Sequence, residues 1–307
     1  MIRHLDPSAE AFLGQLERIQ ARIAKAQRQI SSGKRMDVAS DTPDDIGAVL
    51  QLRAEIGRNE QVRLNLVRAQ SEAATADGVL ARAIQLMTSA ATLAVEGAGA
   101  MASDERRRLL AGQVRGLQEQ MVALSQTMSE GRYLFGGDQD GTPPYRLDLS
   151  VAGTGVEQLQ TSGATRVVEH PSGTTFNVRK TAQQIFDDRD GAGAVTSSNV
   201  FAALQSLRVA LEAGDAAATA TALAAVRDAS AHLNTQEAFY GGAENRIASA
   251  LEDAARIGLR LRSALSDLED TDMTSAILEF NQAQLNERAA LSARAQMTRT
   301  SLFDFLK

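Results

Sequence analysis

The residues with reactive side chains give little support for catalysis. The chain has 307 residues and no cysteine, which rules out both a disulfide framework and a thiolate metal site. Its histidines, His4, His170 and His232, lie far apart in the sequence, and none has a partner at metal-site spacing. Glycine-rich nucleotide loops and a Gly-x-Ser-x-Gly motif are missing as well. We therefore expect no catalytic residue, no metal and no cofactor, and we do not expect an enzyme.

Two short acidic stretches have the form Asp-x-Asp-Gly, at 138–141 and 188–191. A calcium loop of the EF-hand kind needs three oxygen ligands at alternate positions, then glycine, then a distal glutamate. Neither stretch supplies that full set. Turns in which aspartate hydrogen-bonds its own backbone explain both stretches better.

The charge and hydropathy of the chain narrow the choice of partners. The net charge of −6 argues against nucleic acid as the main partner, because phosphate binding requires a basic surface. No run of 18 apolar residues occurs, so we expect no membrane insertion. The first residues lack the charged and apolar regions of a cleaved signal peptide, so any export is expected to use another route.

The strongest pattern lies near the two ends of the chain, where apolar residues alternate at spacings of four and three. Such a pattern predicts long amphipathic helices that pack against other helices. Because a lone chain offers these ends little to pack against, we expect them to form an assembly interface. The residues expected there are Phe12, Leu16, Ile19, Ile23, Ile30, Leu261, Leu265, Leu268, Ile277, Phe280, Leu302, Phe303, Phe305 and Leu306.

The first three helices are predicted from their stripes and their end signals. The first spans about 7–31 and ends at Gly33, and the second runs from about 44 to 95, with Asp41 or Thr42 as its cap and Pro43 at its first position. The third helix is predicted to be capped by Ser103 and to carry an apolar stripe as far as Met128.

A change in composition at Gly131 marks a small insertion rich in β-structure, with strands at 166–169 and 175–179. Helix resumes near Asn199 and stops at Gly214, and an alanine-rich helix follows over about 215–239. Gly241 and Gly242 are expected to break it, and the last helical region is expected to kink near Asp270.

The predicted fold is therefore mainly α, a long antiparallel coiled-coil helical rod formed by both termini with a small, mostly β insertion domain in the middle. Five segments follow from this interpretation. They are an N-terminal axial helix and linker (1–43), a long helical segment (44–131), a β-rich outer domain (132–198), returning helices (199–240), and a C-terminal helical region (241–307).

Several short motifs at both ends resemble the bacterial flagellin family, and within it the proteins that join the flagellar hook to the filament. The motifs are the stretches 29–35, 40–43, 133–137, 242–246, 268–273 and 301–306. Within them, the residues that carry the resemblance are Ser32, Gly33, Lys34, Arg35, Asp41, Pro43, Asn245, Arg246, Asp270 and Asp272.

The resemblance implies a structural subunit that polymerises as an adapter between hook and filament, outside the cell. It also implies export without a cleaved signal peptide, contact with another hook-associated protein and with flagellin, and an export chaperone that covers the C-terminal helix. Two alternatives remain open at this point. One is the filament flagellin itself, and the other, of a different class, is a cytosolic coiled-coil scaffold.

Overall fold

Long α-helices account for most of the structure, as the apolar spacing predicts. The structure is a computed structural model that describes residues 7–36, 45–161, 163 and 165–297. Its helices are α1 (Pro7–Ser32), α2 (Ile46–Ala98), α3 (Asp104–Ser125), α4 (Ala182–Phe186), α5 (Val200–Glu212), α6 (Ala216–Glu269) and α7 (Met273–Met297), with a short 3₁₀ turn η1 (Gly137–Gln139). The predicted mainly α fold class is confirmed.

The insertion between α3 and α5 contains three small antiparallel hairpins. Their strands are β1 (Met128–Ser129) with β2 (Arg132–Tyr133), β3 (Tyr145–Leu147) with β4 (Val156–Gln158), and β5 (Val167–Glu169) with β6 (Thr175–Asn177). The predicted strands at 166–169 and 175–179 are confirmed as β5 and β6, with Val168 opposite Phe176. The other four strands and α4 escaped prediction because two to five residues are too few to show a period.

Contacts within the chain group it into two units. The terminal unit comprises Met1–Arg58 and Ile257–Lys307, and the central unit comprises Asn59–Arg256. Both long helices, α2 and α6, contribute residues to each unit. The five segments inferred from the sequence divide the chain more finely, and they stay a prediction.

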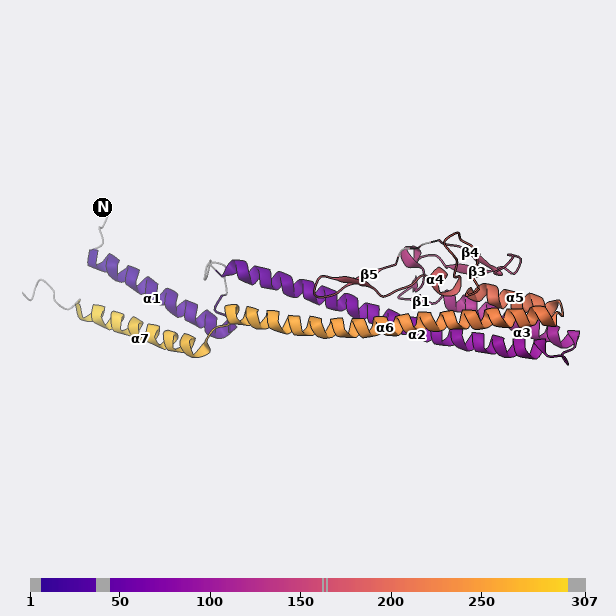
Figure 1. The fold of residues 1–307 in the computed structure, drawn as a ribbon. Helices are drawn as coiled ribbons and strands as arrows, with labels where there is room; N and C mark the ends of the chain where they lie inside the picture. The colour runs from indigo at the N-terminus through magenta and orange to yellow at the C-terminus, as the bar shows by residue number, and fades with distance from the viewer. Residues whose placement is uncertain (1–6, 37–44, 162, 164, 298–307) are drawn as a thin grey trace, which may run out of the picture. The chain divides into compact units, whose positions relative to one another are not determined.

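Within the central unit, α2 and α6 run antiparallel to each other (Figure 1). Near one end, the amide nitrogen of Asn59 donates a 2.9 Å hydrogen bond to the carbonyl of Ala254. Near the other end, Gly97 of α2 lies against α5 and α6, and a Cβ there would come within 2.2 Å of a methyl carbon of Leu211. Glycine at 97 therefore allows the backbone of α2 to approach α5 closely.

Aromatic side chains join the insertion to the helices of the central unit. Phe186 of α4 contacts Phe135 at 5.7 Å and Phe201 of α5 at 6.0 Å between ring centroids, and Tyr145 of β3 contacts Phe201 at 5.0 Å. All four rings are almost fully buried. Although aromatic residues make up only 4% of the chain, they gather where strands meet helices, and this fixes the insertion on its helical base.

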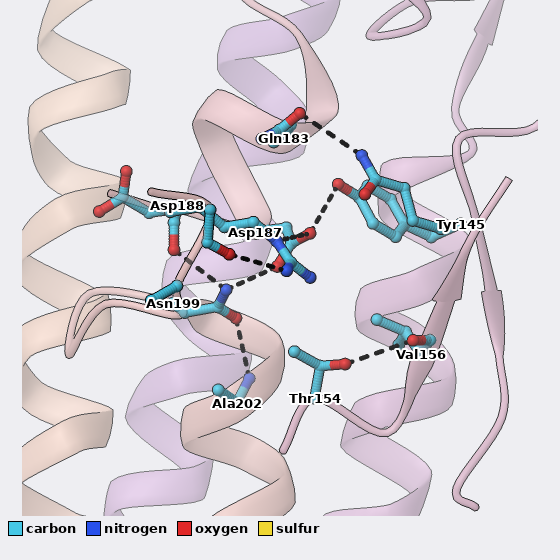
Figure 2. Close-up of polar contacts among 12 residues, drawn as sticks. Tyr145, Thr154, Val156, Gln183, Asp187, Asp188, Asn199 and Ala202 are labelled. Carbon is cyan, nitrogen blue, oxygen red and sulfur yellow. Dashed lines mark hydrogen bonds and ion pairs between the residues drawn. The ribbon is translucent and has the colours of Figure 1, made fainter. Parts of the chain in front are cut away.

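A buried carboxylate organises the polar side of this aromatic core (Figure 2). Asp187 accepts hydrogen bonds from the hydroxyl of Tyr145 at 3.1 Å, from Nε of Arg189 at 2.9 Å and from the amide of Asn199 at 2.6 Å. Asn199 in turn caps α5 by accepting from the backbone N–H of Ala202. Burial and the neighbouring Asp187 charge raise the pKa of Tyr145, so its hydroxyl remains a hydrogen-bond donor.

Two of the predicted helix limits are wrong. Helix α6 continues through Gly241 and Gly242, because neighbouring residues such as Tyr240 and Ala243 are buried and hold the helix in place. An interior glycine costs only about 1 kcal/mol, which such packing outweighs. Helix α3 ends at Ser125, so Met128 belongs to β1 and is half exposed rather than part of a helical stripe.

Two other predicted helix signals are confirmed, whereas the predicted cap of the second helix at Asp41 or Thr42, with Pro43 after it, lies outside the described residues. Ser103 caps α3 by accepting from the N–H of Arg106, and Gly214 has a φ of 70° directly after α5. The expected kink near Asp270 is a complete break, since α6 ends at Glu269 and α7 begins at Met273.

Candidate assembly interface

The two ends of the described chain pair with each other in the terminal unit. Helices α1 and α7 lie side by side and antiparallel (Figure 1). Nε of Arg22 donates to Glu279 at 2.7 Å, and the guanidinium of Arg294 lies 5.7 Å from the ring centre of Phe12. The expectation that a lone chain gives its ends little to pack against is therefore wrong in part, because each terminal helix partly covers the other.

This pairing leaves the predicted interface residues at three levels of burial. Ile19 is buried, at 8% exposure, and Ile277 is exposed, at 45%. The rest of the set within the described chain is half buried, comprising Phe12, Leu16, Ile23, Ile30, Leu261, Leu265, Leu268 and Phe280. A pair of helices can bury only one side of each, so these stripes are covered on one flank alone.

Additional apolar side chains on α7, which the sequence interpretation missed, face away from α1. Leu278, Leu285 and Leu291 are 63%, 64% and 48% exposed, and Leu13 on α1 is 47% exposed. The signal was present in the sequence, because the apolar residues of α7 are spread around the helix instead of forming one stripe. A helix that is apolar on several faces has several neighbours to pack against.

An open groove of about 1030 Å³ lies between α1 and α7. Phe12 and Ile19 line it from α1, and three alanines, Ala289, Ala290 and Ala293, line it from α7. Polar side chains line the rest of the groove, namely Gln15, Arg18, Arg22, Asn286 and Arg294. A groove of this size with both apolar and charged walls could receive a further amphipathic helix.

The motif residues at 32–35 and 268–272 meet where α1 ends and α7 begins. Gly33 adopts a φ of 70° after α1, and its carbonyl accepts from the N–H of Thr271 at 3.0 Å. The N–H of Arg35 donates to the carbonyl of Glu269 at 2.6 Å, so this short segment pairs with the break between α6 and α7. We call this contact the clasp.

The carboxylate of Glu269 is the charged centre of the clasp. Its side chain is only 6% exposed, and it pairs with Lys34 at 3.2 Å and with Arg53 of α2 at 2.6 Å. Arg35 reaches outward to Asp45 at 3.0 Å and to the carbonyl of Leu268. The sequence interpretation named residues on both sides of the clasp and included Glu269 only as part of the stretch 268–273, and it missed Arg53.

Asp272 starts α7. Its carboxylate accepts hydrogen bonds from the N–H groups of Thr274 and Ser275 and from the hydroxyl of Ser275. The side-chain bond from Ser275, followed by the two backbone bonds, lowers the pKa of Asp272 below its usual value. Asp272 is thus the N-cap of α7. Just after α6, the carboxylate of Asp270 accepts a hydrogen bond from the hydroxyl of Ser266.

Two further motif residues fall within the described chain, on a helix of the central unit. Asn245 and Arg246 lie exposed on α6. Asp41, Pro43, Leu302, Phe303, Phe305 and Leu306 lie outside the described residues.

The reactive side chains within the described ranges serve as structural contacts. His170 lies 3.4 Å from Asp253, and His232 contacts the carbonyl of Gln184 at 3.0 Å; His4 is outside the described part. Asp190 accepts from the N–H groups of its own loop, which confirms the turn interpretation of 188–191. Among described residues, no cluster of three or more His, Asp or Glu side chains could hold a metal ion.

One described helix, α2, is long and apolar enough to match a membrane span by length and composition. Part of this helix, including Leu80, Ala83, Met87 and Ala90, lies in the core of the central unit, and 33% of its most apolar stretch is buried. A core helix of a soluble protein can have the same length and apolar composition, so one such helix is weak evidence for insertion into a membrane.

Comparisons with known proteins agree with this arrangement. The model of the bacterial flagellin N-terminal helical region matches residues 7–140, and that of the bacterial flagellin C-terminal helical region matches residues 223–306. Flagellar hook-associated protein 3 of Escherichia coli (strain K12) is 28% identical over 306 residues, or 94% of each chain. Flagellin of Bacillus subtilis (strain 168) is 22% identical over 295 residues, or 93% of each chain.

A solved structure shares the fold. The crystal structure of flagellar hook associated protein-3 from Legionella pneumophila superposes with a TM-score of 0.62 at 15% identity, over 72% of this chain and 98% of that one. The first family region covers α1 to α3 and the β1–β2 hairpin, and the second covers most of α6 with α7. Because these regions span well over half of its length, the chain belongs to the bacterial flagellin family.

Proposed function

We propose that the chain is a structural subunit of the bacterial flagellum that joins hook to filament by polymerising as an adapter. The observation that carries the proposal is the pair of terminal helices, whose apolar side chains stay half covered or exposed. The name of the Escherichia coli relative, a hook-associated protein 3, supports the junction over other positions in the flagellum.

The energetics favour assembly over a stable isolated pair. Ordering a residue costs about 1–2 kcal/mol of backbone entropy, and full burial of a leucine contributes about 1.5–3 kcal/mol. Leu278 and Leu285 give little of that contribution at 63% and 64% exposure. Neighbouring subunits would bury them, together with the predicted interface residues such as Leu16 and Leu265.

The partners follow from this position. The chain would contact copies of itself in a ring or tube, with another hook-associated protein on one side and flagellin on the other. An export chaperone would cover the apolar C-terminal helix before assembly. The subunit would act outside the cell, after export through the flagellar apparatus without a cleaved signal peptide, and would catalyse no reaction.

The filament flagellin is the second candidate, because the Bacillus subtilis relative of that name aligns over 93% of the chain. A filament subunit polymerises without limit, whereas a junction adapter stops after a short ring. A cytosolic scaffold would not be exported at all.

A deletion strain separates these functions. Electron microscopy of its surface and an assay of its spent medium would be made together. Hooks without filaments, with flagellin shed into the medium, are the expected result for a junction adapter. Hooks capped by other junction proteins, with no flagellin in the medium, would show that the chain is the filament subunit.

Variants of the terminal helices test the mechanism. Leu16→Asp and Leu265→Asp should each block assembly while secretion continues, because a carboxylate cannot enter an apolar interface without a partner. Gln27→Asp adds the same charge at an exposed position of α1 and should assemble normally. Normal incorporation of both leucine variants would refute the role of these helices.

A further inference from the structure

A charged cavity in the central unit is explained neither by the core nor by the terminal helices. It has a volume of about 310 Å³ and lies between α2, the β1–β2 hairpin and the ends of the β5–β6 hairpin. Four arginines and three carboxylates line it, namely Arg68, Arg132, Arg166, Arg179, Glu72, Glu130 and Asp140.

The floor of the cavity is a closed ion pair. Arg179 and Glu72 contact each other with both side chains only 11% exposed, and Nε of Arg179 donates to Glu72 at 2.8 Å. This pair balances its own charge and holds the β5–β6 hairpin to α2. Binding of a ligand would therefore depend on the charged groups at the mouth of the cavity.

The mouth carries one positive charge in excess. Asp140, with a 14% exposed side chain, is the carboxylate partner of both Arg132 and Arg166, each at 3.2 Å. Arg68 pairs with Glu130 at 3.3 Å. Three guanidinium groups therefore share two carboxylates, and each guanidinium keeps N–H donors for a further oxygen.

Glu130 occupies its place at a conformational cost. Its φ of 52° is the only positive φ of a non-glycine residue in the described ranges, and Gly131 follows with 77°. A two-residue hairpin loop with both φ values positive favours Asn-Gly or Asp-Gly, so glutamate is a poor choice for the turn itself. Its pairing with Arg68 leaves the two side chains 66% and 58% exposed, and such surface pairs exchange readily.

We propose that this cavity receives an aspartate or glutamate side chain from a second copy of the chain, which displaces Glu130 and binds Arg68, Arg132 and Arg166. A second copy is the occupant that the charge supports, because 38 acidic residues against 32 basic ones make its surface rich in carboxylates. Arginine forks bind carboxylates through paired hydrogen bonds. The inference rests on the proposed function, since it requires subunits that assemble.

Chemical cross-linking tests the contact directly. Arg132→Lys keeps the positive charge and supplies an amine that a carbodiimide joins to a carboxylate in direct contact, with loss of water. Flagella isolated from cells that make only this variant would be treated, and cross-linked peptides would be identified by mass spectrometry. We expect a species of twice the subunit mass in which the introduced amine is linked to an acidic residue of the second copy.

The free variant provides an internal reference, because the introduced amine should then link to Asp140 within one chain. Arg115→Lys is the matched control, since Arg115 lies exposed on α3 beside Glu119 and outside the cavity. If assembled flagella of the Arg132→Lys variant gave only the intrachain link to Asp140, at single-subunit mass, the inference would be overturned while the proposed function stood.

A second variant measures the contribution of the cavity to assembly. Arg132→Gln leaves Asp140 paired with Arg166, so the fold and its thermal unfolding should be unchanged. Loss of one charged hydrogen-bond donor should raise the rate of filament shedding about tenfold. An unchanged rate of filament shedding would contradict a contact between subunits at this cavity. If the natural chain occupied no hook–filament boundary, both the proposed function and this inference would fail.

Discussion

The central and terminal units are built from the same kind of long helix but differ in what the chain itself can bury. The continuous hydrophobic core runs from Val62 to Ala250, and all of it belongs to the central unit. In the described part of the terminal unit the buried apolar residues are Ile19, Ala26, Met36, Val49, Ala276 and Ala283. The central unit therefore buries a continuous apolar core, whereas the terminal unit buries only scattered apolar side chains.

The largest change in the free energy of unfolding should come from the aromatic core of the central unit. Phe186→Ala removes a fully buried ring that contacts Phe135 and Phe201, and it should lower the free energy of unfolding by about 3–5 kcal/mol. Urea unfolding followed by circular dichroism would measure the change.

Leu13→Ala is the matched change in the terminal unit. Leu13 is 47% exposed, so its loss should alter the free energy of unfolding by less than about 0.5 kcal/mol. Equal losses of unfolding free energy in Phe186→Ala and Leu13→Ala would show that the two units do not differ in how much stability their apolar side chains contribute.

A smaller effect is expected at the clasp. Glu269→Gln removes the charge shared by Lys34 and Arg53, and it should destabilise the terminal unit by about 1–2 kcal/mol. Amide hydrogen exchange should report faster opening of α1 and α7, with the central unit unchanged. Glu119→Gln, in an exposed pair on α3, serves as the control. Faster exchange throughout the chain would contradict a local role.

The last effect, which appears only at alkaline pH, concerns the central unit. Burial raises the pKa of Tyr240 to about 12, with the N–H of Lys180 donating to its hydroxyl. Between pH 10 and 12 the folded chain keeps this proton while the unfolded chain releases it, so stability falls as pH rises. The contribution of one tyrosine is at most about 1.4 kcal/mol per pH unit.

Tyr240→Phe should make that decline shallower, and Tyr145, whose pKa is also raised, should account for a further part of it. Unfolding free energies measured at about pH 8, 10 and 11, on both sides of the ordinary tyrosine pKa, would give the slope for each variant. An identical slope in the natural chain and in Tyr240→Phe would mean that Tyr240 ionises as freely in the folded chain as in the unfolded one.

The sequence allowed the long helices to be predicted because their stripes and end signals agree locally. Ser103, Asn199 and Gly214 each act through neighbouring backbone groups, so their effect is visible without the fold. Gly241 and Gly242 were misread because the packing that keeps α6 helical there comes from elsewhere in the chain. The apolar period of α3 likewise says nothing about the hairpin that begins at Met128.

The candidate interface could be predicted only in part, for a related reason. Periodicity identified residues such as Leu16 and Leu265, but it gives no information on which helix covers which stripe. The clasp joins Lys34 to Glu269 across 235 residues, and neither side alone indicates the other. Glu269 follows a regular helical stretch in the sequence, and only the folded chain shows it surrounded by Lys34 and Arg53.

The antiparallel pairing of α1 with α7 also sets the timing of folding. Arg22 and Glu279 are separated by 257 residues. A ribosome that adds about 5–20 residues per second needs roughly 13–50 s to make the second partner after the first. The hairpins of the central unit have their partners much sooner, whereas α1 stays an unpaired amphipathic segment for most of synthesis. During that interval the apolar side of α1 is open to capture by other apolar surfaces.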